Sequence, residues 1–252
     1  MRPPRWIVRL PVVGQVTAKI FRWIALQTQL RYSIVRREGI LIVADLKSII
    51  GKHMYSRGFW EADQIEFLFG FPLPAPASPT GKRWFVDIGA NTGLYSVYSS
   101  KHGRFDRRLA FEPERRNLIE LKFNLQINEI ETVEIQEVGL SDKEGAAILH
   151  NVDNRGRCSL EETSEAGHSQ DIRITTFDQL FQPTGTILVV KMDIEGHEIP
   201  ALKGMKDALT RNSALLQVES SAEKRPALEA FFSSVGYRRF HSIGDDHYFR
   251  NF

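Results

Sequence analysis

Short apolar runs alternate with longer stretches of helical periodicity over most of the chain. The short runs predict buried strands, at 84–87, 109–111, 133–138, 187–192 and 215–219. Helical spacing follows them, at 94–101, 115–128, 198–209 and 227–235. The run 187–192 is apolar almost throughout, which is typical of a central parallel strand. The helix over 115–128 carries apolar residues on two faces, so we expect it to be buried against a sheet. The alternation predicts an α/β fold with a doubly wound, mostly parallel sheet.

The end of the chain and one internal stretch depart from this alternation. Extended runs at 237–241 and 247–250 flank a Gly-Asp-Asp turn and predict an antiparallel hairpin. The polar stretch 142–170 contains one candidate strand, over 146–152. It is either an excursion over the edge of an active site or a loop. Thr176 and Gln179 then form a capping-box pattern that predicts a helix start.

The first third of the chain predicts a different organisation. Residues 1–71 read as a helical extension, although 41–50 is ambiguous between strand and helix and 55–69 suggests a turn followed by a helix. Residues 72–81 hold four prolines without periodicity, which is typical of a linker. The main domain is therefore expected over 82–252.

Residues 1–30 are basic and apolar, with Val13, Val16, Ile20 and Trp23 on one helical face. Arg9 and Pro11 interrupt any signal-peptide core. Two interpretations stay open. The segment is an amphipathic helix lying on an anionic membrane, or it packs against the main domain or forms a homodimer contact. We favour packing, because such helices are far more common than membrane-bound ones.

Composition narrows the function classes. The net charge of +2 over 252 residues gives no global field that would attract nucleic acid. A single cysteine excludes an intramolecular disulfide and a thiolate zinc cluster, which suits a reducing compartment such as the cytoplasm. No apolar run is long enough to cross a bilayer.

The chemistry centres on a glycine turn after the first main-domain strand, where Asp87 precedes Gly89 and Gly93. A strand, a tight turn and a helix N-terminus offer backbone N–H groups and close approach of a ligand. A phosphate loop would require Gly-Lys-Ser/Thr, and a nicotinamide site would require a glycine where Asn91 stands. S-adenosylmethionine fits better, because its ammonium group suits Asp87 and its carboxylate suits the N–H groups of the turn.

Acidic residues close nearly every expected strand, at Asp87, Glu112, Asp142, Asp193 and Glu219. Ligands of open α/β sheets bind at this end of the strands. Glu112 follows the glycine turn by about 20 residues, the spacing of an acid that binds ribose hydroxyls. The alternative for Glu112 is a carboxylate that only favours the N-terminus of the next helix.

A second acidic group, Asp193, Glu195, His197 and Glu198, crowds the turn after the strand 187–192. A hydroxyl acceptor needs a base, and His197 or Glu195 could serve, with Asp193 holding the cofactor amine or the acceptor. Two alternatives are a divalent cation held by Asp193, Glu195 and His197, and acids that only stabilise the next helix. We predict catalysis without a metal.

Five motifs resemble the FkbM-type methyltransferases, in the order of that family and over roughly residues 60–252. They are Val86 to Gly93, Phe111-Glu112-Pro113, Gly139 to Asp142, Thr175 to Asp178, and Lys191 to Glu198. The resemblance implies a class I, Rossmann-like methyltransferase fold with seven strands, the last antiparallel. It also implies S-adenosylmethionine as cofactor and methylation of a hydroxyl on a small molecule or glycan.

The resemblance further implies which residues form the site. Ser141 would lie beside the adenine, and Asp193, Glu195 and His197 would border the transferred methyl group. The expected cofactor-binding residues are Asp87, Gly89, Ala90, Asn91, Thr92, Gly93, Glu112, Pro113, Leu140, Ser141 and Asp193. One departure is Ser220, which follows Glu219 where many members have a histidine. Residues 1–30 have no counterpart that we can name.

Two other functions compete with this expectation. One is a nicotinamide-dependent oxidoreductase built on the same glycine turn. The other is a membrane-associated adaptor that keeps the methyltransferase fold without catalysing a reaction.

Overall fold

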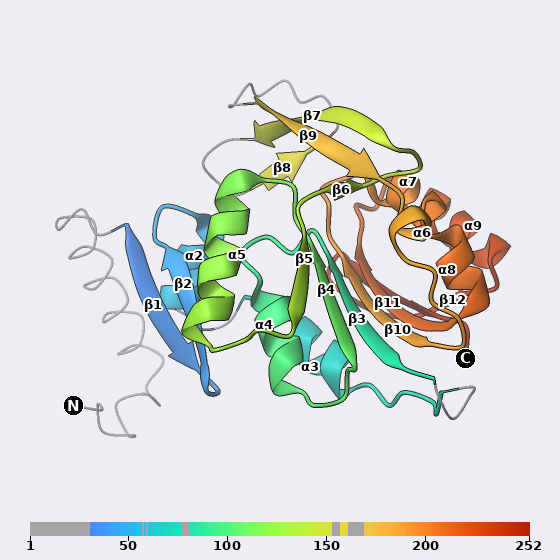
Figure 1. Cartoon of the computed structure of the whole chain (residues 1–252), viewed down its shortest axis with the longest axis horizontal. Helices are drawn as coiled ribbons and strands as arrows, with labels where there is room; N and C mark the ends of the chain where they lie inside the picture. Colours follow the sequence, from blue (N-terminus) through green and yellow to red (C-terminus); the bar gives the residue numbers. More distant parts are fainter. Residues whose placement is uncertain (1–30, 57, 59, 77–80, 153–156, 161–168) are drawn as a thin grey trace. The chain divides into compact units, whose positions relative to one another are not determined.

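The computed structural model describes residues 31–56, 58, 60–76, 81–152, 157–160 and 169–252. The chain forms two compact units, Met1–Ala62 with Asn154–Gly156, and Asp63–Asp153 with Arg157–Phe252. Figure 1 shows a short hairpin in the first unit and a large sheet in the second. The domain limits expected from the sequence, at 71 and 81, stay predictions.

The described part of the first unit is a hairpin followed by a helix. Strands β1 (Tyr32–Arg37) and β2 (Ile40–Asp45) pair antiparallel, and α2 (Ile49–Ser56) follows. Glu38 and Gly39 have φ angles of 48° and 80°, the left-handed pair that a tight two-residue hairpin turn requires. The extension is therefore not helical throughout, because β-branched residues around a Glu-Gly turn favour a hairpin. The amphipathic helix expected over 1–30 lies outside the described residues.

Seven strands form the main sheet, in the order β12-β13-β11-β10-β3-β4-β5. Their bounds are β3 (Arg83–Ile88), β4 (Arg107–Phe111), β5 (Val133–Gln136), β10 (Ile187–Met192), β11 (Ser213–Glu219), β12 (Arg238–Ile243) and β13 (Asp246–Arg250). Neighbours from β5 to β11 are parallel, whereas β13 is antiparallel to both of its neighbours. Every residue of β10 is buried. The predicted doubly wound sheet, with an antiparallel hairpin at its end, is confirmed.

Helices cover both faces of this sheet (Figure 1). On one face lie α3 (Ala62–Gly70), α4 (Leu94–Lys101) and α5 (Arg115–Ile127), and Phe69 of α3 packs on Phe85 of β3. On the other face lie α6 (Phe177–Leu180), α7 (Glu198–Lys203), α8 (Lys206–Arg211) and α9 (Arg225–Ser234). A large apolar core lies between these last helices and the sheet.

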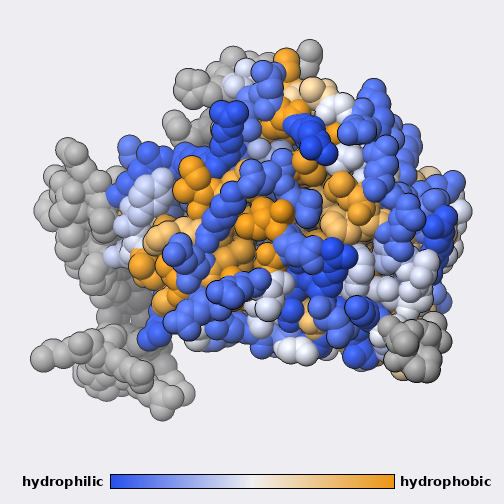
Figure 2. All heavy atoms as spheres, viewed as in Figure 1, coloured by the Kyte–Doolittle hydropathy of each residue, from blue (hydrophilic) through white to orange (hydrophobic). Residues whose placement is uncertain are grey.

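Helix α5 buries only one of its two apolar faces. Leu118, Leu121 and Leu125 are buried, but Ile119 and Phe123 are 68% and 45% exposed. Figure 2 shows apolar surface over this helix. The helix expected to be buried is thus buried along one of its apolar faces, and the other apolar face is exposed.

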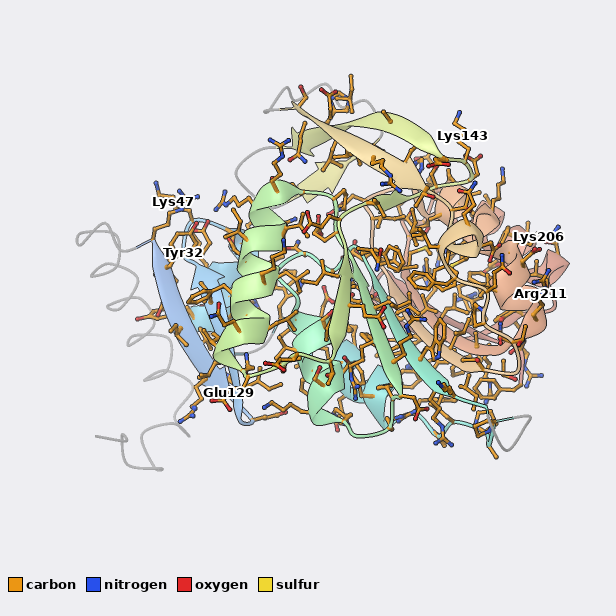
Figure 3. The ribbon with its side chains drawn as sticks, in the orientation of Figure 1. Tyr32, Lys47, Glu129, Lys143, Lys206 and Arg211 are labelled. Atoms are coloured by element: carbon orange, nitrogen blue, oxygen red, sulfur yellow. The ribbon has the colours of Figure 1, made fainter. Side chains whose placement is uncertain are left out.

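The helix expected over 198–209 is broken into α7 and α8 at Gly204 and Met205. A Cβ atom on Gly204 would lie 1.9 Å from the carbonyl oxygen of Ser141, so the chain needs glycine there. The carboxylate of Asp178 accepts hydrogen bonds from the backbone N–H groups of Asp207 and Ala208 and so begins a new helix. Lys206 and Arg211 mark the ends of that helix, α8, at the outer edge of the view in Figure 3.

The described residues of the polar stretch contribute strands to a second sheet. Its strands are β6 (Gly139–Leu140), β7 (Gly145–Val152), β8 (Arg157–Ser159) and β9 (Ser169–Thr175), in the order β6-β9-β7-β8. The strand expected over 146–152 is thus confirmed as β7. Gln170 of β9 fastens this sheet to the segment after β4, since its side chain donates to the carbonyl oxygen of Pro113 and accepts from the N–H of Arg115.

The helices of the described ranges are short or polar compared with membrane-spanning helices. None of the helices in them combines the length and the apolar character that a transmembrane span requires.

Candidate active site

The glycine turn after β3 has the backbone conformation that its sequence predicts. Gly89, Asn91 and Gly93 have φ angles of 75°, 51° and 84°, a region that glycine and asparagine tolerate best. A Cβ atom on Gly89 would lie 1.9 Å from the carbonyl oxygen of Asp193. Glycine at this position therefore lets the end of β10 lie directly against the turn.

The N–H groups of this turn are largely engaged within the protein. Gly89 and Ala90 donate to the carbonyl oxygen of Phe111, at 3.0 and 2.9 Å, and Gly93 donates to that of Ala90 at 2.8 Å. Asn91 donates to Oε2 of Glu112 at 2.7 Å. The expectation of free N–H groups is wrong for these four, because the turn uses them to hold its own shape against β4.

Asp87 lies at the end of β3 and is fully buried. Its Oδ2 accepts a 2.6 Å hydrogen bond from the hydroxyl of Ser96, and the backbone N–H of Ser96 donates to the same carboxyl group. Burial raises the pKa of Asp87, against the opposing charge of Lys191. Its Oδ1 is buried and has no hydrogen-bond partner within the described residues. A buried carboxylate oxygen in this state fits a cationic group such as an ammonium.

Glu112 follows β4 and closes over the same turn. Its two oxygens accept hydrogen bonds from the backbone N–H groups of Asn91 and Glu114, at 2.7 and 2.8 Å. Burial raises its pKa to about 7. Helix α5 is capped by Glu114, which accepts from the N–H of Asn117. Glu114 is therefore the N-cap of α5, while Glu112 also accepts a hydrogen bond from the side chain of Asn117. With three donors on a carboxylate that has about four lone-pair positions, one position remains for a sugar hydroxyl.

Ser141 and His197 meet across the segments that follow β6 and β10. The Oγ of Ser141 lies 3.0 Å from Nε2 of His197, and Ser141 is buried. The backbone of Ser141 is fixed by its bond to the carbonyl oxygen of Thr175 and by its contact with Gly204. His197 therefore lies against the residue that we expect to border the adenine.

Asp193 belongs to a different group, at the end of β10. Its Oδ2 lies 3.5 Å from Nζ of Lys191, and its side chain is 25% exposed. It also hydrogen-bonds Glu219 at the end of β11. Glu195 is exposed, in a left-handed conformation with φ of 53°. Asp193 and His197 are thus both half-buried and bonded to neighbours, but Asp193 is the one that meets another carboxyl group.

The alternative of a divalent cation at Asp193, Glu195 and His197 finds no support in this geometry. Within the part of the chain that the structure describes, no three His, Cys, Asp or Glu side chains come together in a way that could hold a metal ion. His197 faces Ser141, whereas Asp193 faces Lys191 and Glu219.

The sequence analysis did not identify Lys191 and Gln217 as buried polar residues of this site. Lys191 donates to the carbonyl oxygen of Gly89 at 2.9 Å. The Nε2 of Gln217, which is fully buried, donates to Oη of Tyr95 and to Oδ1 of Asp246. The signal was present in the sequence, because Lys191 and Gln217 interrupt runs that are otherwise apolar. Central strands rarely bury such residues without a polar partner.

Comparison with known proteins agrees with the geometry. Residues 87–239, more than half of the chain, match the family model described as the Methyltransferase FkbM domain. A relative from Sordaria araneosa, "Methyltransferase sdnD", is 26% identical over 198 residues, which cover 64% of this chain and 74% of the relative.

Two solved structures are similar to this chain in their backbone fold. "Methyltransferase FkbM" from Methylobacillus flagellatus is 17% identical with a TM-score of 0.49, over 95% of this chain and 59% of that chain. The M. jannaschii TYW2 in complex with AdoMet is 14% identical with a TM-score of 0.43, over 87% of this chain and 84% of that chain. With its glycine turn, its acidic strand ends and the match over 87–239, the protein belongs to the FkbM family of S-adenosylmethionine-dependent methyltransferases.

Proposed function

We propose that the protein transfers a methyl group to a hydroxyl oxygen of a small molecule or glycan. The observation that carries this proposal is the hydrogen-bonded carboxyl pair of Asp193 and Glu219, at the ends of neighbouring strands β10 and β11. The backbone of Asp193 also touches the glycine turn at Gly89. A group that can take a proton therefore adjoins the segment expected to hold the methyl donor.

The cofactor would be held by the residues around the turn. Asp87 offers a buried oxygen to the ammonium group, Glu112 offers an acceptor to a ribose hydroxyl, and Ser141 borders the adenine. When bound, S-adenosylmethionine supplies a methyl group on a positively charged sulfur. The protein's contribution is to align the acceptor oxygen with that methyl group, which provides most of the acceleration of an in-line displacement.

A hydroxyl oxygen is a weak nucleophile until its proton is removed. Among the three predicted catalytic residues, Asp193 suits this task best. His197 is engaged with Ser141, and Glu195 is exposed. A pair that holds one proton between two carboxyl groups carries less negative charge than two carboxylates, which suits a neutral hydroxyl better than an ammonium group. An acidic strand end also disfavours nucleic acid, whose phosphates require basic contacts.

Two measurements test this function. Isothermal titration should show binding of S-adenosylmethionine and of S-adenosylhomocysteine to the folded protein. Methyl-labelled cofactor should then be incubated with a panel of glycosides, activated sugars and alcohols, and with amine analogues of the same skeletons. We expect label on oxygen. Transfer to the amines alone would overturn the proposal, and absence of binding at millimolar cofactor would remove its basis.

A further inference from the structure

Three acids close three neighbouring strands in one row. Glu219 of β11 is the cross-strand partner of Asp246 of β13. On its other side, Met192 of β10 is paired with Val218, so Asp193 comes next to Glu219 where the two strands end. Parallel neighbours place residues of one register row on the same face of a sheet. Glu219 is therefore flanked by a carboxyl group on each side.

The two flanking acids are held differently. Asp246 accepts hydrogen bonds from Gln217 at 2.8 Å and from Gln64 at 3.2 Å, so both of its oxygens are occupied by amide donors. Asp193 instead hydrogen-bonds Glu219 itself. A carboxylate can only accept hydrogen bonds, so two carboxyl groups can bond each other only when one of them carries a proton.

The charges around this pair favour retention of that proton. Burial raises the pKa of Glu219 to about 9, and the negative charges of Asp193, Asp246 and Glu195 act in the same direction. The nearest cation is Lys191, 3.5 Å from Asp193 and already bonded to the carbonyl oxygen of Gly89. Lys224, from the segment before α9, bonds the carbonyl oxygen of Gly196. The positive charge of Lys191 alone does not neutralise three carboxylates, at Asp193, Glu219 and Asp246.

We propose that Glu219 and Asp193 form a carboxyl pair that holds one proton in the resting protein and receives the acceptor's hydroxyl proton during methyl transfer. In this pair Asp193 faces the acceptor, and Glu219 is a positioning residue that acts through it. The inference rests on the proposed function and adds to it the residue, Glu219, that positions Asp193.

The atoms, electrons and protons of this step balance. Methyl transfer to a hydroxyl converts a cationic donor and a neutral alcohol into a neutral thioether, a neutral ether and one proton. The C–S bond breaks with its electron pair on sulfur, the C–O bond forms from an oxygen lone pair, and the O–H proton passes to Asp193. Glu219 keeps its own proton, which orients the receiving oxygen of Asp193. The pair gives the additional proton to solvent after product release.

The first test examines the pair in the absence of cofactor. The carboxylic-acid carbonyl band in the infrared spectrum should be followed with pH in the wild type, in Glu219→Gln and in Glu223→Gln, an exposed acid that serves as the control. Above pH 8, where Glu112 has lost its proton, we expect one carboxyl group of the wild type and of the control to remain protonated and to titrate near pH 9. That band should be missing in Glu219→Gln. The same band in Glu219→Gln, or its absence from the wild type, would overturn the pair.

The second test links the pair to the methyl donor. Titration of S-adenosylmethionine in buffers of different ionisation enthalpy, between pH 8 and 9.5, measures the protons released on binding. The positive sulfonium charge should lower the pKa of the pair, so binding of S-adenosylmethionine should release a fraction of a proton per protein. Binding of S-adenosylhomocysteine, whose sulfur is neutral, should release less. Glu219→Gln should abolish this difference and Glu223→Gln should keep it. Equal release from wild type and Glu219→Gln would refute the assignment. If neither the wild type nor the variants bind the cofactor, the proposed function is wrong. The infrared experiment then still shows whether Glu219 and Asp193 share a proton.

Discussion

The ammonium group of Lys191 donates a 2.9 Å hydrogen bond to the carbonyl oxygen of Gly89. The side chain is 6% exposed and also lies 3.5 Å from Asp193. Through this one residue, strand β10 holds both the glycine turn that follows β3 and the acid at its own end. The cofactor side and the acceptor side of the expected site are therefore connected by a buried cation.

Replacement of this cation should destabilise the protein. Lys191→Met keeps the apolar stem but leaves Gly89 without its donor and fully buried Asp87 without its nearest positive charge. Loss of one partner of a buried charge pair costs about 3 kcal/mol of unfolding free energy. Because burial raises the pKa of Asp87, part of that loss should be recovered as the pH falls and Asp87 takes up a proton. Urea denaturation measures both effects. Lys203→Met, at an exposed position, is the control, and equal stability of the two variants would contradict the role given to Lys191.

Cofactor binding should weaken in mild acid because of Glu112. Burial raises the pKa of this carboxyl group from 4.5 to about 7 in the folded protein. Below that pH it gains a proton and loses an acceptor for a ribose hydroxyl. The dissociation constant of S-adenosylmethionine should therefore rise as pH falls below 7, towards about tenfold per unit. In Glu112→Gln the constant should be larger at pH 8 and independent of pH. Titration calorimetry between pH 5.5 and 8.5 checks this, and an equally steep dependence in the variant would show that another group is responsible.

The raised pKa of Glu112 also affects the stability of the protein, which should increase, rather than decrease, as the pH falls. The folded protein binds the proton of Glu112 more tightly than the unfolded chain, whose carboxyl keeps the ordinary pKa of 4.5. The stabilisation is complete below pH 4.5 and is lost as pH rises through 7. The unfolding free energy of the cofactor-free protein should accordingly fall across this window, as far as Glu112 contributes.

The elements of the main domain could be foreseen from the sequence because their local signals agree. The expected helix over 94–101 and strand over 187–192 coincide with α4 and β10. The glycine turn, too, has the conformation that Gly89 and Gly93 predict. In each case periodicity, turn residues and burial all favour the same structure, so tertiary contacts did not have to override any of them.

Sequence reasoning failed where distant segments decide the structure. The break at Gly204 depends on the backbone of Ser141, which is far away in the chain. The exposed face of α5 looks apolar in sequence, yet it has no role in covering the sheet. Glu219 was recognised as a strand end, but its position beside Asp193 follows from the register between β10 and β11. Pairing across strands cannot be read from one strand alone.

The close contact between Gly204 and Ser141 gives a test of packing. Gly204→Ala places a methyl group 1.9 Å from a carbonyl oxygen, so one of the two backbones must move. We expect a loss of about 2 kcal/mol or more in unfolding free energy. Because Ser141 is displaced, binding of the adenine part of the cofactor should weaken as well. Gly103→Ala is the matched control, since its Cβ would meet nothing within 4 Å. Similar denaturation midpoints for the two variants would contradict this account.

Two substitutions at one contact separate the two roles open to Asp87. Its Oδ2 bonds Ser96 at the start of α4, while its buried Oδ1 has no partner among the described residues. Asp87→Asn keeps the shape but removes the charge, so loss of a charged hydrogen bond to the cofactor ammonium should raise the dissociation constant by about 10- to 100-fold. Ser96→Ala keeps the charge and the backbone N–H bond and removes only the bond from the hydroxyl, so it should cost about 1 kcal/mol of stability with little change in binding. Calorimetric titration and urea denaturation of both variants measure the two effects. If Asp87→Asn binds the cofactor as tightly as the wild type, the carboxylate serves only to begin α4.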